Sequence, residues 1–157
     1  MHKTKHVQAI LTAMLCIATI CLSTQRAYSH EFNIDGVFFN ENMPTKNSDL
    51  RSSLVAYDVS LQMLKNNLGA INSLDSKHFI KIVGRTDDQE CNGDECMRLS
   101  LRRAQMVYQW MISNGVPQNR FLPPEGLGSR SPLDNNATPQ GRARNRLVEF
   151  LIVPSTP

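Results

Sequence analysis

The sequence is poor in the residues that usually mark a metal site or a nucleophilic active site. Its 157 residues include four cysteines and one tryptophan, and aromatic residues make up 6%. Within residues 30–157, no second cysteine pair and no histidine stands at zinc-ligand spacing, and no Ser, His and Asp arrangement indicates an activated nucleophile. Internal repeats, low-complexity tracts and a linker between two domains are missing as well. We therefore expect one modest domain that is not an enzyme and needs no cofactor.

A hydrophobic run long enough to cross a membrane is also missing. Residues 7–22 are nearly uncharged, but this run is shorter than the about 20 residues that a spanning helix needs. Two lysines precede it and small residues end the segment at Ser29, which predicts a secretory signal peptide over residues 1–29. An uncleaved N-terminal anchor is the alternative. A lipid anchor is not indicated, because neither Cys16 nor Cys21 follows the small residues of a lipoprotein signal.

Residues 30–157, the predicted mature domain, have no excess of either charge. Fourteen basic side chains face fourteen acidic ones once residues 1–29 are removed, so nucleic acid is not an expected partner. Two cysteines remain, Cys91 and Cys96, and an even pair in an exported chain indicates a disulfide. Its closed loop is short and contributes about 2 kcal/mol, so its main effect is to shape the loop between a strand and a helix.

The hydrophobic pattern predicts alternating strands and helices. Strands are predicted at residues 32–39, 79–83 and 147–153, a proline-interrupted edge strand at 120–127, and helices at 50–68 and 96–114. Gly69 is expected to stop the first helix, and Thr138-Pro139 to begin a short helical turn that reaches residue 145. The order β-α-β-α-(β)-(α)-β predicts an α/β sandwich, with helices packed on a mixed parallel/antiparallel sheet.

The central stretch, residues 84–104, places one carboxylate and one guanidinium near each other. Asp87 lies where the second strand leads toward the second helix, and Arg103 lies on or beside the apolar stripe of that helix. The stripe is predicted to consist of Leu99, Met106, Val107 and Trp110. A guanidinium at such a position needs an acceptor nearby. Either the two charges form a structural ion pair, which chemistry alone favours, or they stand apart and bind a ligand that carries both an ammonium and a carboxylate group.

Three motifs, in order, resemble the OmpA C-terminal-like family. They are G-R-T-D followed by L-S-L-R-R-A-Q-M-V, then G-V-P with a later E-G-L-G, then G-R-A-R-N-R-L-V-E-F. This family consists of peptidoglycan-binding domains, shared with peptidoglycan-associated lipoproteins and the periplasmic part of flagellar stators. The resemblance covers about residues 37–153. It implies noncovalent binding to the diaminopimelate of the peptidoglycan stem peptide.

The resemblance assigns the ligand contacts to four residues. The aspartate of the T-D motif falls on Asp87, which is expected to take the ammonium group. The arginine of the L-S-x-x-R-A motif falls on Arg103, which is expected to take the carboxylate. Thr86 assists through its hydroxyl or its backbone. The family's F-D-x-N segment resembles Phe39-Asn40-Glu41-Asn42 and implies that the Asn42 amide reaches the same site.

Three departures from the family pattern fall close to these residues. The family's Asn-Arg-Arg segment matches Asn145-Arg146, but its second arginine is replaced by Leu147. The interval from T-D to R-A is one residue longer in this chain. The asparagine usually found three residues before Leu-Ser is replaced by Cys96. We expect the disulfide from Cys91 to rebuild the loop that this asparagine would support.

Two alternatives to this interpretation follow from the residues. Residues 88–94 resemble the start of a calcium loop, but Leu99 stands at the twelfth position, where the bidentate glutamate belongs, and a solvated acidic loop is expected instead.

The alternative function is a periplasmic adaptor or inhibitor that binds a protein partner, with Asp87 and Arg103 as a structural pair. In either case the predicted location is the periplasm, with association with the outer membrane and with an envelope complex left open.

Overall fold

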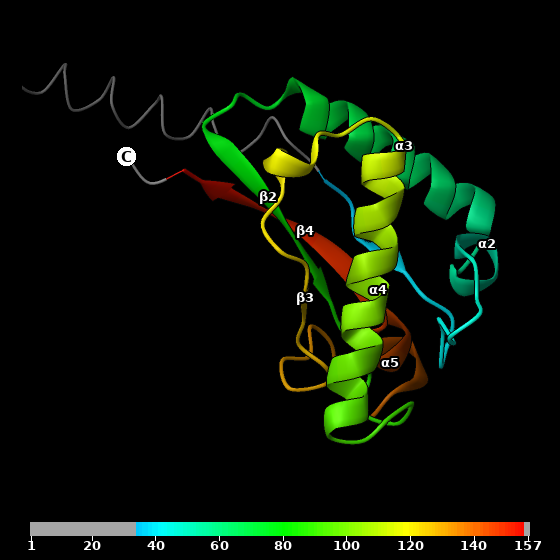
Figure 1. Ribbon diagram of the computed structural model, residues 1–157. Helices are drawn as coiled ribbons and strands as arrows, with labels where there is room; N and C mark the ends of the chain where they lie inside the picture. The colour runs from blue at the N-terminus through cyan, green and yellow to red at the C-terminus, as the bar shows by residue number, and fades with distance from the viewer. Residues whose placement is uncertain (1–33, 156–157) are drawn as a thin grey trace, which may run out of the picture. The chain divides into compact units, whose positions relative to one another are not determined.

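The computed structural model describes residues 34–155, which form one mixed four-stranded sheet covered by helices (Figure 1). The predicted signal peptide, residues 1–29, lies outside the described residues. The strands, in the order β1-β4-β2-β3 across the sheet, are β1 (Val37–Phe38), β4 (Leu147–Pro154), β2 (His78–Gly84) and β3 (Glu125–Gly126). β4 runs antiparallel to β1 and β2, whereas β3 runs parallel to β2. The predicted fold class and its mixed sheet are confirmed.

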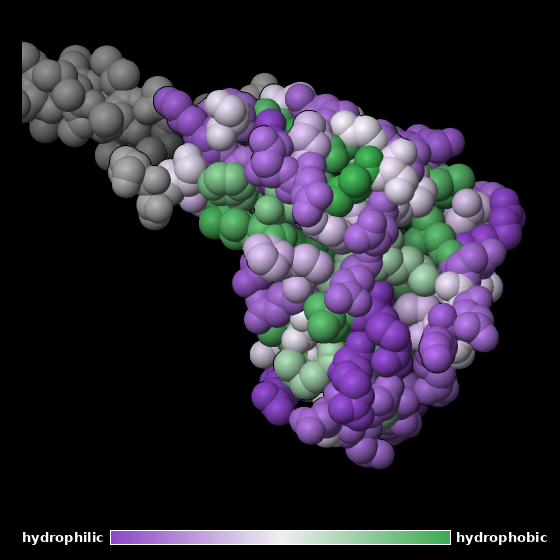
Figure 2. Space-filling model, viewed as in Figure 1, coloured by the Kyte–Doolittle hydropathy of each residue, from purple (hydrophilic) through white to green (hydrophobic). Residues whose placement is uncertain are grey.

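The helices connect these strands in the predicted order. They are α2 (Leu50–Ser53), α3 (Tyr57–Ser73), α4 (Asp94–Ser113), the 3-10 helix η1 (Gln118–Arg120) and α5 (Pro139–Asn145). α4 packs on β2, β3 and β4, and α3 packs against β1. Figure 2 shows hydrophilic side chains along the outward face of α4, where Glu95, Arg98, Gln105 and Gln109 are exposed. Within residues 34–155, no helix combines the length and the apolar character that crossing a membrane requires.

The prediction of one continuous helix over residues 50–68 was wrong in two places. The helix is interrupted near its start, and it continues past its predicted end. α2 stops after one turn because Leu54 pairs with Phe39 at the edge of the sheet, and the backbone then turns through Ala56 at φ 44°. α3 continues past Gly69 to Ser73, because the buried face of the helix extends to Ile71. In both cases tertiary packing overrides a local propensity of about 1 kcal/mol.

α4 buries a stripe that is rotated slightly from the predicted one. Met106 and Trp110, expected to face inward, are half-buried at its flanks. The buried residues are Cys96, Leu99, Ser100, Arg103, Ala104, Val107 and Met111. The stripe therefore includes small and polar residues at its N-terminal half, where the helix lies closest to the sheet.

Two glycines set this close approach of α4 to the sheet. A Cβ atom on Gly84 would lie 1.9 Å from the Ser100 carbonyl oxygen, and one on Gly126 would lie 2.4 Å from the Leu101 nitrogen. The Ser100 hydroxyl donates to Met97 O at 3.0 Å and accepts from the Gly128 nitrogen at 2.9 Å, which fastens the same contact. The carboxyl end of β2 is thereby held against the turn of α4 that carries Arg103.

The segment before β4 is organised around one buried asparagine. Asn145 accepts hydrogen bonds from Leu133 N and Asp134 N, and its amide group donates to Asp134 O and Asn136 Oδ1, all at 2.8 Å. The predicted cap at Thr138 is confirmed, since its hydroxyl accepts from Gly141 N with Pro139 at the helix start. The predicted edge strand is confirmed as β3, although it is two residues long.

Candidate functional site

Arg103 is fully buried, and each of its five N–H groups has an acceptor. Three acceptors are backbone carbonyl oxygens: Met43 O at 2.7 Å from Nε, Arg85 O at 2.9 Å from Nη1, and Asn40 O at 3.2 Å from Nη2. The other two are the carboxylate oxygens of Glu90, at 2.6 Å from Nη1 and 2.7 Å from Nη2. The guanidinium is therefore saturated by the protein itself.

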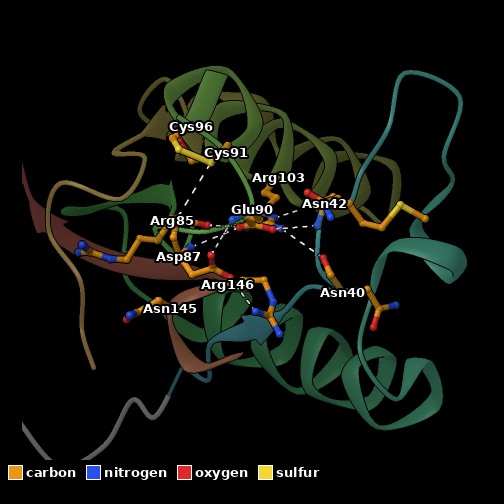
Figure 3. Close-up of polar contacts among 12 residues, drawn as sticks. Asn40, Asn42, Arg85, Asp87, Glu90, Cys91, Cys96, Arg103, Asn145 and Arg146 are labelled. Carbon is orange, nitrogen blue, oxygen red and sulfur yellow. Dashed lines mark hydrogen bonds and ion pairs between the residues drawn. A yellow bond between two sulfur atoms is a disulfide. The ribbon is translucent and has the colours of Figure 1, made fainter. Parts of the chain in front are cut away.

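The carboxylate of Glu90 lies at the centre of a four-donor site (Figure 3). Besides the two bonds from Arg103, it accepts one from the Asn42 backbone nitrogen at 2.8 Å and one from the Asp87 backbone nitrogen at 3.3 Å. Neither the Glu90 nor the Arg103 side chain has any exposed area. The bidentate geometry and the two backbone donors are those that proteins use to bind carboxylates.

The segment after β1 shapes one wall of this site. Asn42 adopts φ 60°, a left-handed conformation that asparagine tolerates better than most residues, and this turn aims its N–H at Glu90. The Phe39 ring centroid lies 5.4 Å from the Arg103 guanidinium carbon, close enough for a cation–π contact. Burial lowers the pKa of Arg103 below its usual value, although the hydrogen bonds to Glu90 oppose that shift.

Asp87 is almost fully buried and has a different arginine as its partner. Arg146 Nη1 donates to Asp87 Oδ2 at 2.6 Å, while Oδ1 accepts from Gln89 N at 2.7 Å and from Glu90 N at 2.9 Å. Burial alone would raise the pKa of Asp87, but the hydrogen bonds from Arg146 and from the two backbone N–H groups hold it below its usual range. Asp87 thus orders the turn that presents Glu90.

The structure contradicts one of the two arrangements of Asp87 and Arg103 that the sequence suggested. The prediction of a direct ion pair between them was wrong, because each charge is paired with another residue among those described. The two residues nevertheless lie in one site, linked through the backbone and side chain of Glu90. The acidic loop is solvated as predicted over most of residues 88–94, where Asp88, Gln89, Asn92, Gly93 and Asp94 are exposed, but the Glu90 side chain turns inward.

The two assisting residues occupy the site in unequal ways. Thr86 is fully buried and its hydroxyl has no hydrogen-bond partner among residues 34–155, while its backbone nitrogen donates to Gly128 O at 3.1 Å. Asn42 contributes its backbone N–H to the carboxylate site, and the residue itself is exposed. The structure thus shows a backbone contact for Asn42, and the expected contact of its side-chain amide with a ligand stays a prediction.

The structure joins Cys91 and Cys96 in a disulfide with a Cα–Cα distance of 5.1 Å. Both cysteines are buried against Leu99. Because Cys91 directly follows Glu90 and Cys96 lies in the first turn of α4, the bond ties the end of the acidic loop to the helix that carries Arg103. Among residues 34–155, no cluster of three or more His, Cys, Asp or Glu side chains is arranged to hold a metal ion.

Sequence reasoning missed two side chains of this candidate site, Glu90 and Arg146. Arg146 belonged to a matched motif, and its position just before β4 brings it beside Asp87 once β4 pairs with β2. Glu90 had no such signal, because it is one of several acidic residues in the loop. Its inward turn depends on the hydrogen bonds from Asp87 and on the donors that Asn42 and Arg103 provide.

Comparisons with known proteins agree with this fold. Outer membrane protein A of Bordetella avium is 45% identical over 75 residues, which are 46% of this chain and 37% of that protein. Peptidoglycan-binding protein ArfA of Mycobacterium tuberculosis is 38% identical over 73 residues, 46% of this chain and 22% of that protein. The chain thus spans well under half the length of these curated relatives.

A solved structure gives the same fold at lower sequence identity. The C-terminal domain of Helicobacter pylori MotB aligns with a TM-score of 0.63 at 22% identity, covering 79% of this chain and 89% of that one. The OmpA family model matches residues 58–146, from the second residue of α3 to the end of α5 and the following Arg146. This range includes Asp87, Glu90 and Arg103, and it is more than half of the chain. The chain therefore belongs to the OmpA family.

Proposed function

We propose that this protein binds peptidoglycan noncovalently in the periplasm, through the diaminopimelate of the stem peptide. One observation carries the proposal: four N–H donors converge on a single carboxylate position, and a second carboxylate, Asp87, lies beside it. The side-chain end of diaminopimelate carries one carboxylate and one ammonium group. A site with a buried carboxylate receptor next to a buried acid is complementary to both charges.

Each ligand group has a receptor in this proposal. The ligand carboxylate takes the place of the Glu90 carboxylate against Arg103 and the Asn42 N–H. The ligand ammonium binds Asp87, whose pKa below the usual range keeps it ionised at neutral pH. The buried Thr86 hydroxyl, which has no partner in the structure, supplies a further acceptor or donor. No cofactor and no covalent step is needed.

The relatives support the partner class. One of them is itself a peptidoglycan-binding protein, and others are an outer membrane protein and MotB. A periplasmic location also fits the signal peptide that we propose for residues 1–29, followed by the binding domain over residues 30–157, and the disulfide that the structure contains. Docking on an envelope complex is compatible with this location.

A second function is favoured by one specific observation. Both charges of the site already have internal partners, Glu90 for Arg103 and Arg146 for Asp87, so the site is electrostatically satisfied without a ligand. A domain that kept the fold but binds a protein partner would retain such pairs for stability. The two functions are separated by whether the site residues are needed for binding to the cell wall.

Sedimentation with purified sacculi tests the proposed function. The oxidised protein, isolated from the periplasm after expression of the full chain, should sediment with sacculi and be released by free diaminopimelate. Free lysine lacks the second carboxylate and should release much less. Asp87→Asn and Arg103→Lys should reduce sedimentation strongly, whereas Asp88→Asn, a charge loss on the exposed part of the same loop, should not. Failure of the parent protein to sediment would favour the protein-partner function.

A further inference from the structure

The acceptors around Arg103 differ in how readily they can leave. Three are backbone carbonyl oxygens of Asn40, Met43 and Arg85, which are fixed by the path of the chain. The remaining two belong to the side chain of Glu90. Because no N–H group of the guanidinium is free, an external carboxylate can bind Arg103 in this way only if Glu90 moves out.

We propose that Glu90 is an exchangeable internal ligand, whose carboxylate fills a binding site for an external carboxylate group and must swing out before that group can enter. The closed structure is then the unliganded state, and the identity of the external carboxylate as that of diaminopimelate rests on the proposed function. Glu90 also sets specificity, because a neutral ligand group that displaced it would leave a buried guanidinium without its counter-charge.

The local structure allows this exchange. Asp88 and Gln89 are exposed, and the Glu90 backbone is held by one hydrogen bond, from its N–H to Asp87 Oδ1 at 2.9 Å. The next residue, Cys91, is fixed to α4 by the disulfide. In the proposed exchange, rotation of the Glu90 side chain carries its carboxylate into water, while the loop stays anchored at both ends.

In this exchange, one carboxylate group replaces another. An incoming carboxylate re-forms the two bonds from Arg103 and those from the Asn42 and Asp87 nitrogens, and the outgoing Glu90 regains its hydration. With an internal competitor of this kind, the apparent association constant is the intrinsic constant multiplied by the fraction of molecules in which the Glu90 carboxylate has left the site. If that fraction is about 1%, removing the competitor raises the affinity about 100-fold.

The first test compares Glu90→Gln with Asp88→Asn by calorimetric titration of diaminopimelate. Each protein is used in its oxidised form, isolated from the periplasm after expression of the full chain. Both variants remove one negative charge from the same loop, but only Glu90 occupies the Arg103 site. Glu90→Gln should bind diaminopimelate at least about tenfold more tightly than the wild type, and Asp88→Asn should match the wild type. Equal affinity of all three proteins, or equal gains in both variants, would overturn the proposal.

The second test does not depend on peptidoglycan. Glu90→Ala empties the site, and acetate has the carboxylate and the one further carbon that the substitution removes. Acetate should raise the melting temperature of Glu90→Ala much more than that of Asp88→Asn. Absence of this rescue would refute a carboxylate receptor at Arg103. Rescue by acetate, with no binding of diaminopimelate to any variant, would support an exchangeable Glu90 and refute the proposed function.

A third measurement uses the wild-type protein, in case the variants fold poorly. NMR can follow the side-chain carboxyl carbon of Glu90 and the amide signals of Asn42 and Asp87 during titration with diaminopimelate, or with acetate if diaminopimelate gives no change. The Glu90 signal should move to the position of a solvent-exposed glutamate as the ligand saturates. Saturable binding at the Asn42 and Asp87 amides with an unchanged Glu90 signal would show that Glu90 stays in place, against the proposal.

Discussion

Glu90 and Arg103 form a two-point ion pair from which solvent is excluded, with Nη1–Oε1 at 2.6 Å, Nη2–Oε2 at 2.7 Å and no exposed area on either side chain. This pair joins the acidic loop to the middle of α4. It both stabilises the closed loop and occupies the site where we propose that a ligand carboxylate binds. Stability and binding should therefore respond in opposite directions when Glu90 is changed.

Replacing Arg103 should destabilise the fold strongly. Arg103→Lys keeps a positive charge but cannot form the two-point contact with Glu90 or reach the three carbonyl oxygens together, so a buried carboxylate loses its partner. We expect the free energy of unfolding to fall by about 3–5 kcal/mol, measured by urea denaturation. Arg102→Lys, one residue earlier on the half-exposed face of α4, is the control and should change it little. Similar losses in both variants would contradict this account.

Adding one methyl group to Gly84 should push α4 away from the sheet. The new Cβ would lie 1.9 Å from the Ser100 carbonyl oxygen, a contact with rigid backbone. Gly84→Ala should therefore cost about 2 kcal/mol or more in unfolding free energy and weaken any ligand binding that needs Arg103.

Gly69→Ala is the matched control for that substitution. Gly69 lies inside α3, and a Cβ there would meet no atom within 4 Å. The control should stabilise the protein by about 0.5–1 kcal/mol, because alanine has the higher helix propensity. Thermal melts of the two variants should therefore shift in opposite directions, and a loss in both would refute the assigned cause.

Acid should destabilise the protein partly through Asp87. Its pKa in the folded state lies below its usual value, so the unfolded chain binds the proton first as the pH falls. The stabilisation by Asp87 is complete above about pH 5 and is lost below about pH 4, as the pH falls from the unfolded value of about 3.9 through the folded one. Melting temperatures from pH 6 to pH 2 should thus decrease more for the wild type than for Asp87→Asn, and parallel curves would contradict the assignment.

Removing the disulfide should affect stability and binding through different routes. The variant with Cys91→Ser and Cys96→Ser should lose about 2 kcal/mol of unfolding free energy, because the closed loop is short. It should also bind diaminopimelate more tightly, because the loop no longer holds Glu90 beside Arg103 as firmly. In the Glu90→Gln background the same two substitutions should leave the affinity nearly unchanged. An equal gain in both backgrounds would show that the disulfide acts independently of Glu90.

Much of the fold and part of the site could be predicted from the sequence, because those features depend on local patterns. The apolar period placed β2, α4 and β4, and the Thr138-Pro139 signal placed α5. The motif around Asp87 and the position of Arg103 on the inward face of α4 identified two charges that do lie in one site. Alternation, capping chemistry and helical spacing operate within a few residues, so they can be read along the chain.

The tertiary structure alone decided which charges pair. Asp87, Asp88 and Glu90 lie within four consecutive positions, and nothing in their spacing says which one reaches Arg103. The choice depends on the path of a loop held at one end by β2 and at the other by the disulfide, and on an N–H that Asn42 brings from the far side of the site. A buried guanidinium selects the carboxylate whose geometry satisfies the most donors at once, and that selection exists only after the distant segments have packed together.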